Sequence, residues 1–120
     1  MSRLLFPQEK KHPSIRHLQG HSDIVEEVLA AVEREEIVVV GMSQNPYCKK
    51  ARKHLEERKT SFTYLEYGSY LKQWNRRLSL KMWLGWPTFP MVFVRGQFIG
   101  GYDNLLSLEK SGELQEILAS

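Results

Sequence analysis

The chain has 120 residues, 42% of them hydrophobic, which suffices for a single domain with one buried core. It has no apolar run near the roughly 20 residues that a membrane span needs, and its start is too polar for a signal peptide, so we expect a cytoplasmic protein without a membrane anchor. The single cysteine excludes an internal disulfide, and the net charge of +3, with basic residues not interleaved with aromatic ones, argues against nucleic-acid binding.

Residues 1–21 show no sustained hydrophobic period and contain Pro7 and Pro13, which predicts an irregular N-terminal arm. From Ser22, apolar residues recur at helical spacing to residue 34, so a folded domain is expected over residues 22–120. The β-branched run at residues 37–40 has no polar alternation, which predicts a central strand covered on both faces.

A second helix is predicted to begin at Pro46, because Asn45 can cap it and proline is tolerated at the first helical position. It extends to about residue 58, and a second strand follows at residues 62–66. A third helical stretch is predicted at residues 70–83. Its apolar residues share one side: Leu71, Trp74, Leu78 and Met82.

Residues 91–99 predict an antiparallel hairpin, because the dipeptide Arg95-Gly96 suits a two-residue turn with positive φ. Asp103 or Asn104 is expected to cap a last helix, which is interrupted near Gly112. A βαβ crossover followed by a helix and a hairpin makes a four-stranded mixed sheet flanked by helices. The pattern therefore predicts an α/β protein whose arrangement resembles the thioredoxin fold.

Three stretches carry candidate chemistry. Cys48 lies in the first turn of the second helix, where the helix dipole and nearby lysines lower a thiol pKa if the thiol is exposed; the alternative is a buried, inert cysteine. The segment 86–90 ends in Phe89-Pro90, where a cis bond would leave backbone groups free to pair with an extended peptide. Gly100-Gly101-Tyr102-Asp103 begins a helix whose N–H groups can hold a carboxylate.

Taken together, these stretches resemble the glutaredoxin family over residues 36–118. Asn45-Pro46-Tyr47-Cys48 stands where dithiol members have Cys-Pro-Tyr-Cys, and residues 85–114 are similar to the monothiol branch. The resemblance implies a thioredoxin-like fold and a glutathione-binding groove. It also implies protein partners that are glutathionylated or carry disulfides, and a monomer or weak dimer.

The resemblance assigns roles to particular residues. The backbone at Phe89, before a cis Pro90, would pair with the cysteinyl unit of glutathione, and Asp103 with the N–H groups near Tyr102 would hold its γ-glutamyl end. Arg77 or Lys81 would meet the glycyl carboxylate. With Cys48 as the candidate catalytic residue, the expected substrate-binding residues are Tyr47, Thr88, Phe89, Pro90, Gly101, Tyr102 and Asp103; no metal-ligating residue is expected.

The sequence also departs from the family pattern. Asn45 stands at the nucleophile position, and Met42 replaces the basic residue before the motif. Counting back from Trp86 instead places Cys48 at the monothiol nucleophile, but that register breaks the match of Leu55 to the helix that follows. We prefer the first register, with about three residues inserted between positions 70 and 85.

Three functions remain open from the sequence. Cys48 could attack glutathione mixed disulfides, with external glutathione completing the exchange. Alternatively, the domain binds glutathione, an iron–sulfur cluster or a partner without this chemistry, and Asn45 is only a helix cap. In the third hypothesis the N-terminal arm and the basic segment 49–59 form a protein-interaction surface, although such a segment is equally consistent with a solvated helix face.

Overall fold

The computed structural model describes residues 22–69 and 73–119, so the predicted N-terminal arm lies outside the described residues. None of the described helices is long and apolar enough to cross a membrane. The elements in chain order are α2 (Ser22–Arg34), β1 (Ile37–Gly41), α3 (Pro46–Glu57), β2 (Thr63–Glu66), α4 (Trp74–Leu84), β3 (Met91–Val94), β4 (Gln97–Gly100), α5 (Tyr102–Ser111) and α6 (Glu113–Ala119).

The four strands form one mixed sheet in the order β2-β1-β3-β4. β1 runs parallel to β2, with Val39 opposite Tyr64, and antiparallel to β3, with Val39 opposite Val92. β3 and β4 form the predicted hairpin, whose turn residues Arg95 and Gly96 have φ values of 50° and 83°. Positive φ at both positions matches the twist of the two strands. The predicted four-stranded mixed sheet is therefore confirmed.

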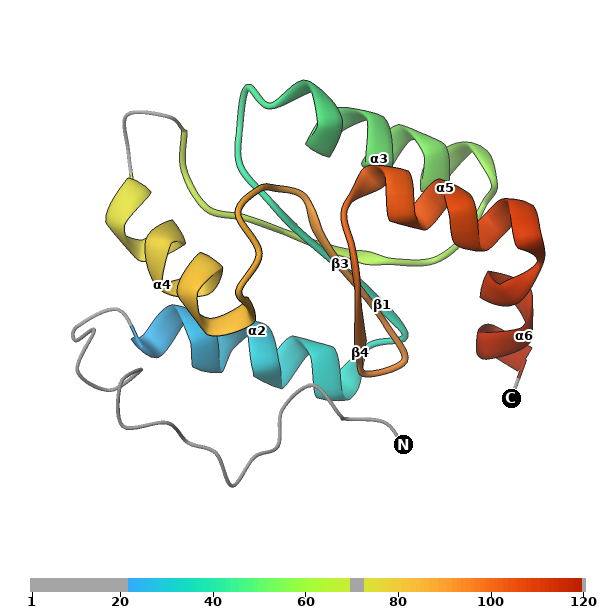
Figure 1. The fold of residues 1–120 in the computed structure, drawn as a ribbon, viewed down its shortest axis with the longest axis horizontal. Coiled ribbons are helices and arrows are strands. Elements are labelled where there is room, and N and C mark those ends of the chain that lie inside the picture. The colour runs from blue at the N-terminus through green and yellow to red at the C-terminus, as the bar shows by residue number, and fades with distance from the viewer. Residues whose placement is uncertain (1–21, 70–72, 120) are drawn as a thin grey trace.

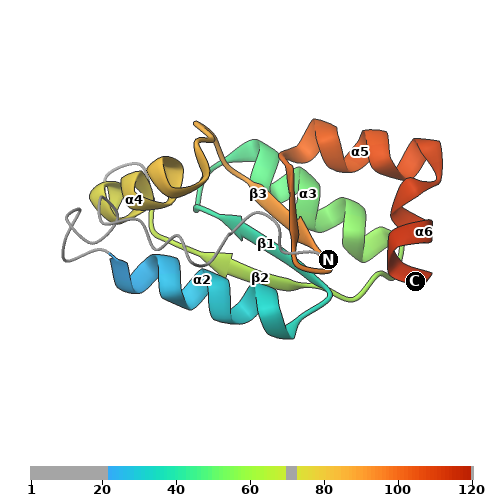
Figure 2. The same cartoon turned by 60° about the horizontal axis from the view of Figure 1, so that its bottom comes forward.

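Helices cover both faces of this sheet. In Figure 1, α2 and α4 lie on one side of the strands, and α3 and α5 lie on the other. Figure 2 shows the same two helical layers after rotation, with α6 beside the C-terminal end of α5. Successive residues of β1 point to opposite faces, so Val38 and Val40 join a core with α2 while Ile37 and Val39 join a second core with α3 and α5. This two-sided burial explains why the strand is apolar throughout.

Of the apolar side predicted for the third helical stretch, Leu71 lies outside the described residues, and the other three residues face solvent instead of the core. In α4, Trp74 is 60% exposed, and Leu78 and Met82 are exposed as well. The buried side carries Leu80 and the guanidinium of Arg77, whose Nη1 donates to the carbonyl oxygens of Tyr67 (3.0 Å) and Ser69 (2.7 Å). A buried backbone carbonyl needs a donor, and Arg77 supplies it to the segment between β2 and α4. This requirement determines which side of α4 faces the core, and the hydrophobic periodicity of the sequence does not indicate it.

A second correction concerns the start of α5. The helix begins at Tyr102 with Gly101 as its N-cap, so Asp103 and Asn104 lie inside the first turn and neither is the cap. Asn104 Oδ1 instead accepts a hydrogen bond from the Gly101 N–H at 2.9 Å. The predicted interruption at Gly112 is confirmed, with φ of 85° between α5 and α6.

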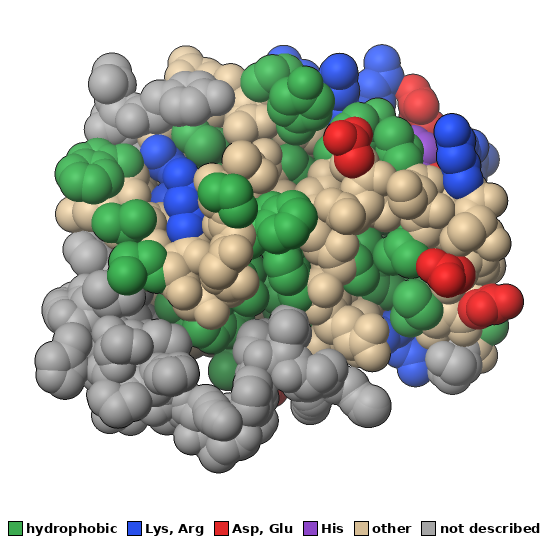
Figure 3. All heavy atoms as spheres, in the orientation of Figure 1, with side chains coloured by type: hydrophobic (Ala, Val, Ile, Leu, Met, Phe, Trp, Pro, Cys, Tyr) green, Lys and Arg blue, Asp and Glu red, His purple; other side chains and the backbone are tan. Residues whose placement is uncertain are grey.

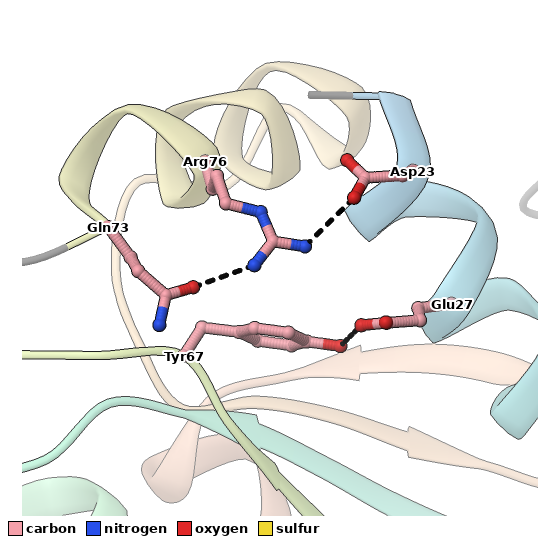
Figure 4. A network of polar contacts seen from close by, with 5 residues as sticks. All are labelled: Asp23, Glu27, Tyr67, Gln73 and Arg76. Carbon is pink, nitrogen blue, oxygen red and sulfur yellow. Dashed lines mark hydrogen bonds and ion pairs between the residues drawn. The ribbon is translucent and has the colours of Figure 1, made fainter. Parts of the chain in front are cut away.

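A polar network ties α2 to α4 and to the segment after β2 (Figure 4). Arg76 on α4 pairs with Asp23 on α2 at 3.1 Å and donates to Gln73 at 2.8 Å. Below it, the Tyr67 hydroxyl donates to Glu27 at 2.6 Å. Burial, followed by the hydrogen bond to Glu27, raises the pKa of Tyr67, so this hydroxyl stays a donor at physiological pH. The network fixes α4 against α2.

On the other face, α3 is tied to α5 by Glu109. Its carboxylate contacts His54 Nε2 and pairs with Arg58 Nε at 3.0 Å. Partial burial by itself would raise the pKa of Glu109, but the hydrogen bonds and charges of His54 and Arg58 outweigh it and lower the pKa. The carboxylate therefore stabilises the fold above its ordinary pKa of 4.5, and this contribution disappears as the pH falls through the lower folded-state pKa.

Replacing Glu109 with glutamine is expected to reduce the free energy of unfolding at pH 7 by roughly 1–2 kcal/mol, because a charge-assisted contact becomes neutral. The difference from the parent should shrink in acid, since only the parent has this carboxylate to protonate. Urea denaturation at pH 7 and at pH 3 measures both values. The control is Glu57→Gln, because Glu57 is exposed and pairs with Lys53 only at 4.0 Å. A pH-independent effect of Glu109→Gln would contradict the ion-pair assignment.

Candidate functional site

Three segments distant in the sequence meet at one end of the sheet. They are the start of α3 (residues 45–48), the loop before β3 (residues 88–90) and the start of α5 (residues 101–103), and we call them the three-segment site. The rings of Tyr47 and Tyr102 lie 6.3 Å apart, centre to centre. A Cβ at Gly101 would lie 3.4 Å from the carbonyl oxygen of Pro90. All seven residues predicted to bind substrate, including Thr88, belong to these segments.

Asn45 caps α3. Its backbone is extended, and its Oδ1 accepts hydrogen bonds from the N–H groups of Tyr47 (2.9 Å) and Cys48 (3.1 Å). Pro46, at the first helical position, has no N–H to satisfy. Such a cap typically stabilises a helix by about 1 kcal/mol. The donors that would otherwise point out of this helix end are thus used within the chain.

Cys48 lies inside the protein, 1% exposed, and belongs to the core cluster beside α2. Its Sγ would be only 2.8 Å from a Cβ at Gly41, so the absence of a side chain at this glycine makes room for the thiol. Burial raises the pKa of Cys48, although a backbone hydrogen bond with Met42 and the charge of Arg52 act in the opposite direction. Of the two alternatives that the sequence left open, an exposed thiol with a lowered pKa or a buried cysteine, the structure has the buried one, because the third residue of α3 faces the core.

Alkylation of Cys48 by iodoacetamide should be slow in the native protein and fast after denaturation in urea. The reagent needs an accessible thiolate, and the fold provides neither access nor a low pKa. The pH at half-maximal native rate is expected to lie above the ordinary cysteine value of about 8.5. Rapid native labelling with a midpoint below pH 7 would contradict this assignment of Cys48.

Tyr64 is a residue near this site that the sequence analysis did not single out. Its hydroxyl would lie 2.7 Å from a Cβ at Gly41, and it donates to Glu66 at 3.1 Å. The guanidinium of Arg52 lies 4.2 Å from the centre of its ring. Tyr64 and the Arg52 side chain therefore help to cover the region of Cys48. The alternating strand pattern at residues 62–66 could have indicated the position of Tyr64, since it places Phe62 and Tyr64 on the face of the sheet that packs against α3.

The loop before β3 provides the second wall of the site. The Phe89-Pro90 peptide bond is cis, as predicted, and both residues are buried, whereas Thr88 is exposed. The ammonium of Lys81 lies 5.8 Å from the centre of the Phe89 ring. Of the two basic residues considered for this wall, Lys81 is beside the site, whereas Arg77 is buried and bound to backbone carbonyls of the β2–α4 segment.

The start of α5 provides the third wall and differs from the start of α3. Its N-cap is Gly101, which has no side chain to accept from the N–H groups of Tyr102 and Asp103. Nearby, Trp86 Nε1 is buried without a hydrogen-bond partner within residues 22–69 and 73–119. Backbone donors at a helix start, with the positive end of the helix dipole, suit an anionic group. The site therefore has one capped and one uncapped helix start.

The surface around the site carries basic and apolar side chains. In the view of Figure 3, basic side chains lie along the top edge, over α3, and a second group lies at the left among apolar side chains, over α4. On α3, the ammonium of Lys50 lies 5.0 Å from the centre of the exposed Tyr47 ring. The long-range field near the site is thus favourable for an anionic ligand.

Comparisons with known proteins agree with this fold. The Glutaredoxin family model matches residues 37–99. A glutaredoxin-like protein of Dictyostelium discoideum is 47% identical over 94 residues, which cover 78% of this chain and 76% of that protein. Wheat glutaredoxin has a TM-score of 0.68 at 28% identity, covering 79% of this chain and 90% of its own.

A buckwheat glutaredoxin, solved as a glutathione complex, shares the fold with a TM-score of 0.69 at 20% identity, over 82% of this chain and 90% of its own. The family match extends from β1 to β4 and includes the first two segments of the site. With its thioredoxin-like sheet and these relatives, the chain belongs to the glutaredoxin family of redox proteins.

Proposed function

We propose that the three-segment site binds glutathione without covalent attachment, and that the domain does not carry out thiol–disulfide exchange through Cys48. The observation that carries the proposal is the start of α3. Asn45 occupies its tip and uses the first N–H groups, while the only thiol lies 1% exposed behind it. A nucleophile must be an accessible thiolate, and no such group stands at this helix start.

The rest of the site suits glutathione, a tripeptide with a carboxylate at each end. The uncapped N–H groups of Tyr102 and Asp103 suit the γ-glutamyl carboxylate, and the Asp103 carboxylate, exposed to solvent, suits the adjacent ammonium group. The backbone at Phe89, before cis Pro90, suits the cysteinyl amide and carbonyl groups. Lys81, beside Phe89, suits the glycyl carboxylate.

An iron–sulfur cluster does not fit the residues of this site. A cluster is held by thiolates, and here the tip of α3 carries an amide while the only thiol is buried. Within the described part of the chain, no three His, Cys, Asp or Glu residues are grouped to hold a metal. We therefore expect no visible absorption band after anaerobic incubation with iron and sulfide.

Titration calorimetry with reduced glutathione tests the proposal. The parent should bind in the micromolar to millimolar range, and Asp103→Ala should weaken binding about tenfold or more, because a charge-assisted hydrogen bond is lost. The matched control is Glu113→Ala, since Glu113 is an exposed acid in the first turn of α6, outside the site. Absence of heat and of amide chemical-shift changes at millimolar glutathione would rule out the proposed function.

A further inference from the structure

The amide of Asn45 is held at one end and open at the other. Its Oδ1 accepts from two backbone N–H groups, and because both partners are donors, the orientation of the amide is determined. The Nδ2 group has no hydrogen-bond partner among the residues that the structure describes. The start of α3 therefore presents a neutral, fixed N–H donor in place of its backbone donors.

The position of this donor relative to a ligand rests on the proposed function. With the γ-glutamyl group at the start of α5 and the cysteinyl backbone along Phe89, the remaining wall for the cysteinyl side chain is the start of α3. That wall is close to α5, because the rings of Tyr47 and Tyr102 lie 6.3 Å apart, centre to centre, at an interplanar angle of 47°. The sulfur of bound glutathione then faces Asn45.

We propose that Asn45 Nδ2 donates a hydrogen bond to the sulfur of bound glutathione and makes the site selective for the thiolate over disulfide-linked forms. A thiolate is a charged acceptor, and hydrogen bonds to charged acceptors are roughly twice as strong as those to neutral ones. A disulfide sulfur is a weak, uncharged acceptor. In this chain the nucleophilic sulfur of the site would belong to the ligand, and the protein supplies the group that stabilises it.

The charged and titratable groups near the three-segment site lie on four elements, α3, α4, β2 and α5. The cations favour a thiolate there: Lys49, Lys50 and Arg52 on α3, and Lys81 on α4. The acids oppose it: Glu66 on β2 and Asp103 on α5. Tyr64 stays neutral, because burial raises its pKa. The cations named here outnumber the acids. This excess of positive charge and the positive end of the α3 dipole both stabilise a thiolate, as the Asn45 donor does.

Titration calorimetry at pH 6 and pH 9 tests this selectivity with reduced glutathione and S-methylglutathione. The S-methyl probe has the same carboxylates and amine but no ionisable thiol. Its change in affinity between the two pH values therefore measures the effect of every titrating group other than the thiol. Reduced glutathione is expected to bind about fivefold or more tightly at pH 9, as its thiol ionises, while the S-methyl probe changes less than about twofold. Oxidised glutathione should bind more weakly than reduced glutathione at pH 9.

Asn45→Asp is the sharpest variant, because it keeps an oxygen to cap α3 and removes the N–H donor. Its affinity for the S-methyl probe at each pH is the internal reference, because the added charge acts on both probes. Against that reference, reduced glutathione should lose its gain in affinity at pH 9, whereas Cys48→Ala, which removes the buried thiol, should keep that gain. If Asn45→Asp still binds reduced glutathione more tightly at pH 9 than at pH 6, the role of Asn45 is overturned. Equal pH responses of the two probes in the parent would overturn the inference and leave the proposed function standing, whereas no binding of either probe would overturn both.

Discussion

Replacing Asn45 with cysteine is expected to raise the rate of glutathione-dependent reduction of a glutathionylated peptide by at least about 100-fold, because the site gains its missing nucleophile. Loss of the Asn45 Oδ1 also releases the N–H groups of Tyr47 and Cys48. These donors and the positive end of α3 would then lower the pKa of the new thiol. The resulting thiolate would attack the glutathione sulfur and release the peptide thiolate, and a second glutathione would regenerate the enzyme.

The rate is measured with a fluorescent glutathionylated peptide across pH 5–9. Asn45→Ser is the matched control, since serine also caps a helix but supplies no thiol. Combining Asn45→Cys with Cys48→Ala should preserve the gain in rate, because Cys48 is buried and is not required for the attack. If Asn45→Cys is no faster than Asn45→Ser, Asn45 does not occupy a position from which a thiolate can reach the ligand.

Replacing Phe93 with alanine is expected to lower the free energy of unfolding by about 3–5 kcal/mol, because a buried aromatic ring is lost and a cavity remains. Phe93 on β3 is 1% exposed and packs on Trp83 and Phe98, with ring centres 6.4 Å and 5.3 Å away. Chemical denaturation at neutral pH gives the change. A loss of this size is a large part of the stability of a small domain.

The matched control for Phe93→Ala is Trp74→Ala, which removes a larger ring from a position that is 60% exposed. That change should stay within about 0.5 kcal/mol of the parent, because surface substitutions away from special contacts have small effects. Equal losses for the two variants would show that the α4 surface carries packing energy that the structure does not account for.

The sequence predicted the sheet because its strands have simple causes. The β-branched residues of β1 can be buried on both faces only in a central strand, and Arg95-Gly96 allows few turns other than a tight hairpin. The meeting of the three segments followed from the strand order, since the start of α3, Pro90 and Gly101 must lie at one sheet end. These features depend on local geometry and topology, which residue types specify directly.

Other features depend on long-range partners, and the sequence could not reveal them. The rotation of α4 depends on Arg77 reaching the carbonyls of Tyr67 and Ser69, a polar requirement with no period. Cys48 could have faced either way, because its side depends on the space left at Gly41 by a different element. The roles assigned to Phe89 and Asp103 come from family resemblance and stay predictions.

The sheet separates two apolar cores, one beside α2 and α4 and one beside α3, α5 and α6; among the described helices, α3 alone contributes to both, through Cys48 on one side and Ala51 and Leu55 on the other. Each layer has its own polar tie, Arg76 with Asp23 in one and Glu109 with His54 in the other. Amide hydrogen exchange in the two layers should therefore respond separately to solution conditions. Loss of the Glu109 charge, as in Glu109→Gln, would speed exchange in α5 before α2, and it would raise the mobility of the wall that begins with Gly101 while the opposite layer keeps its own tie.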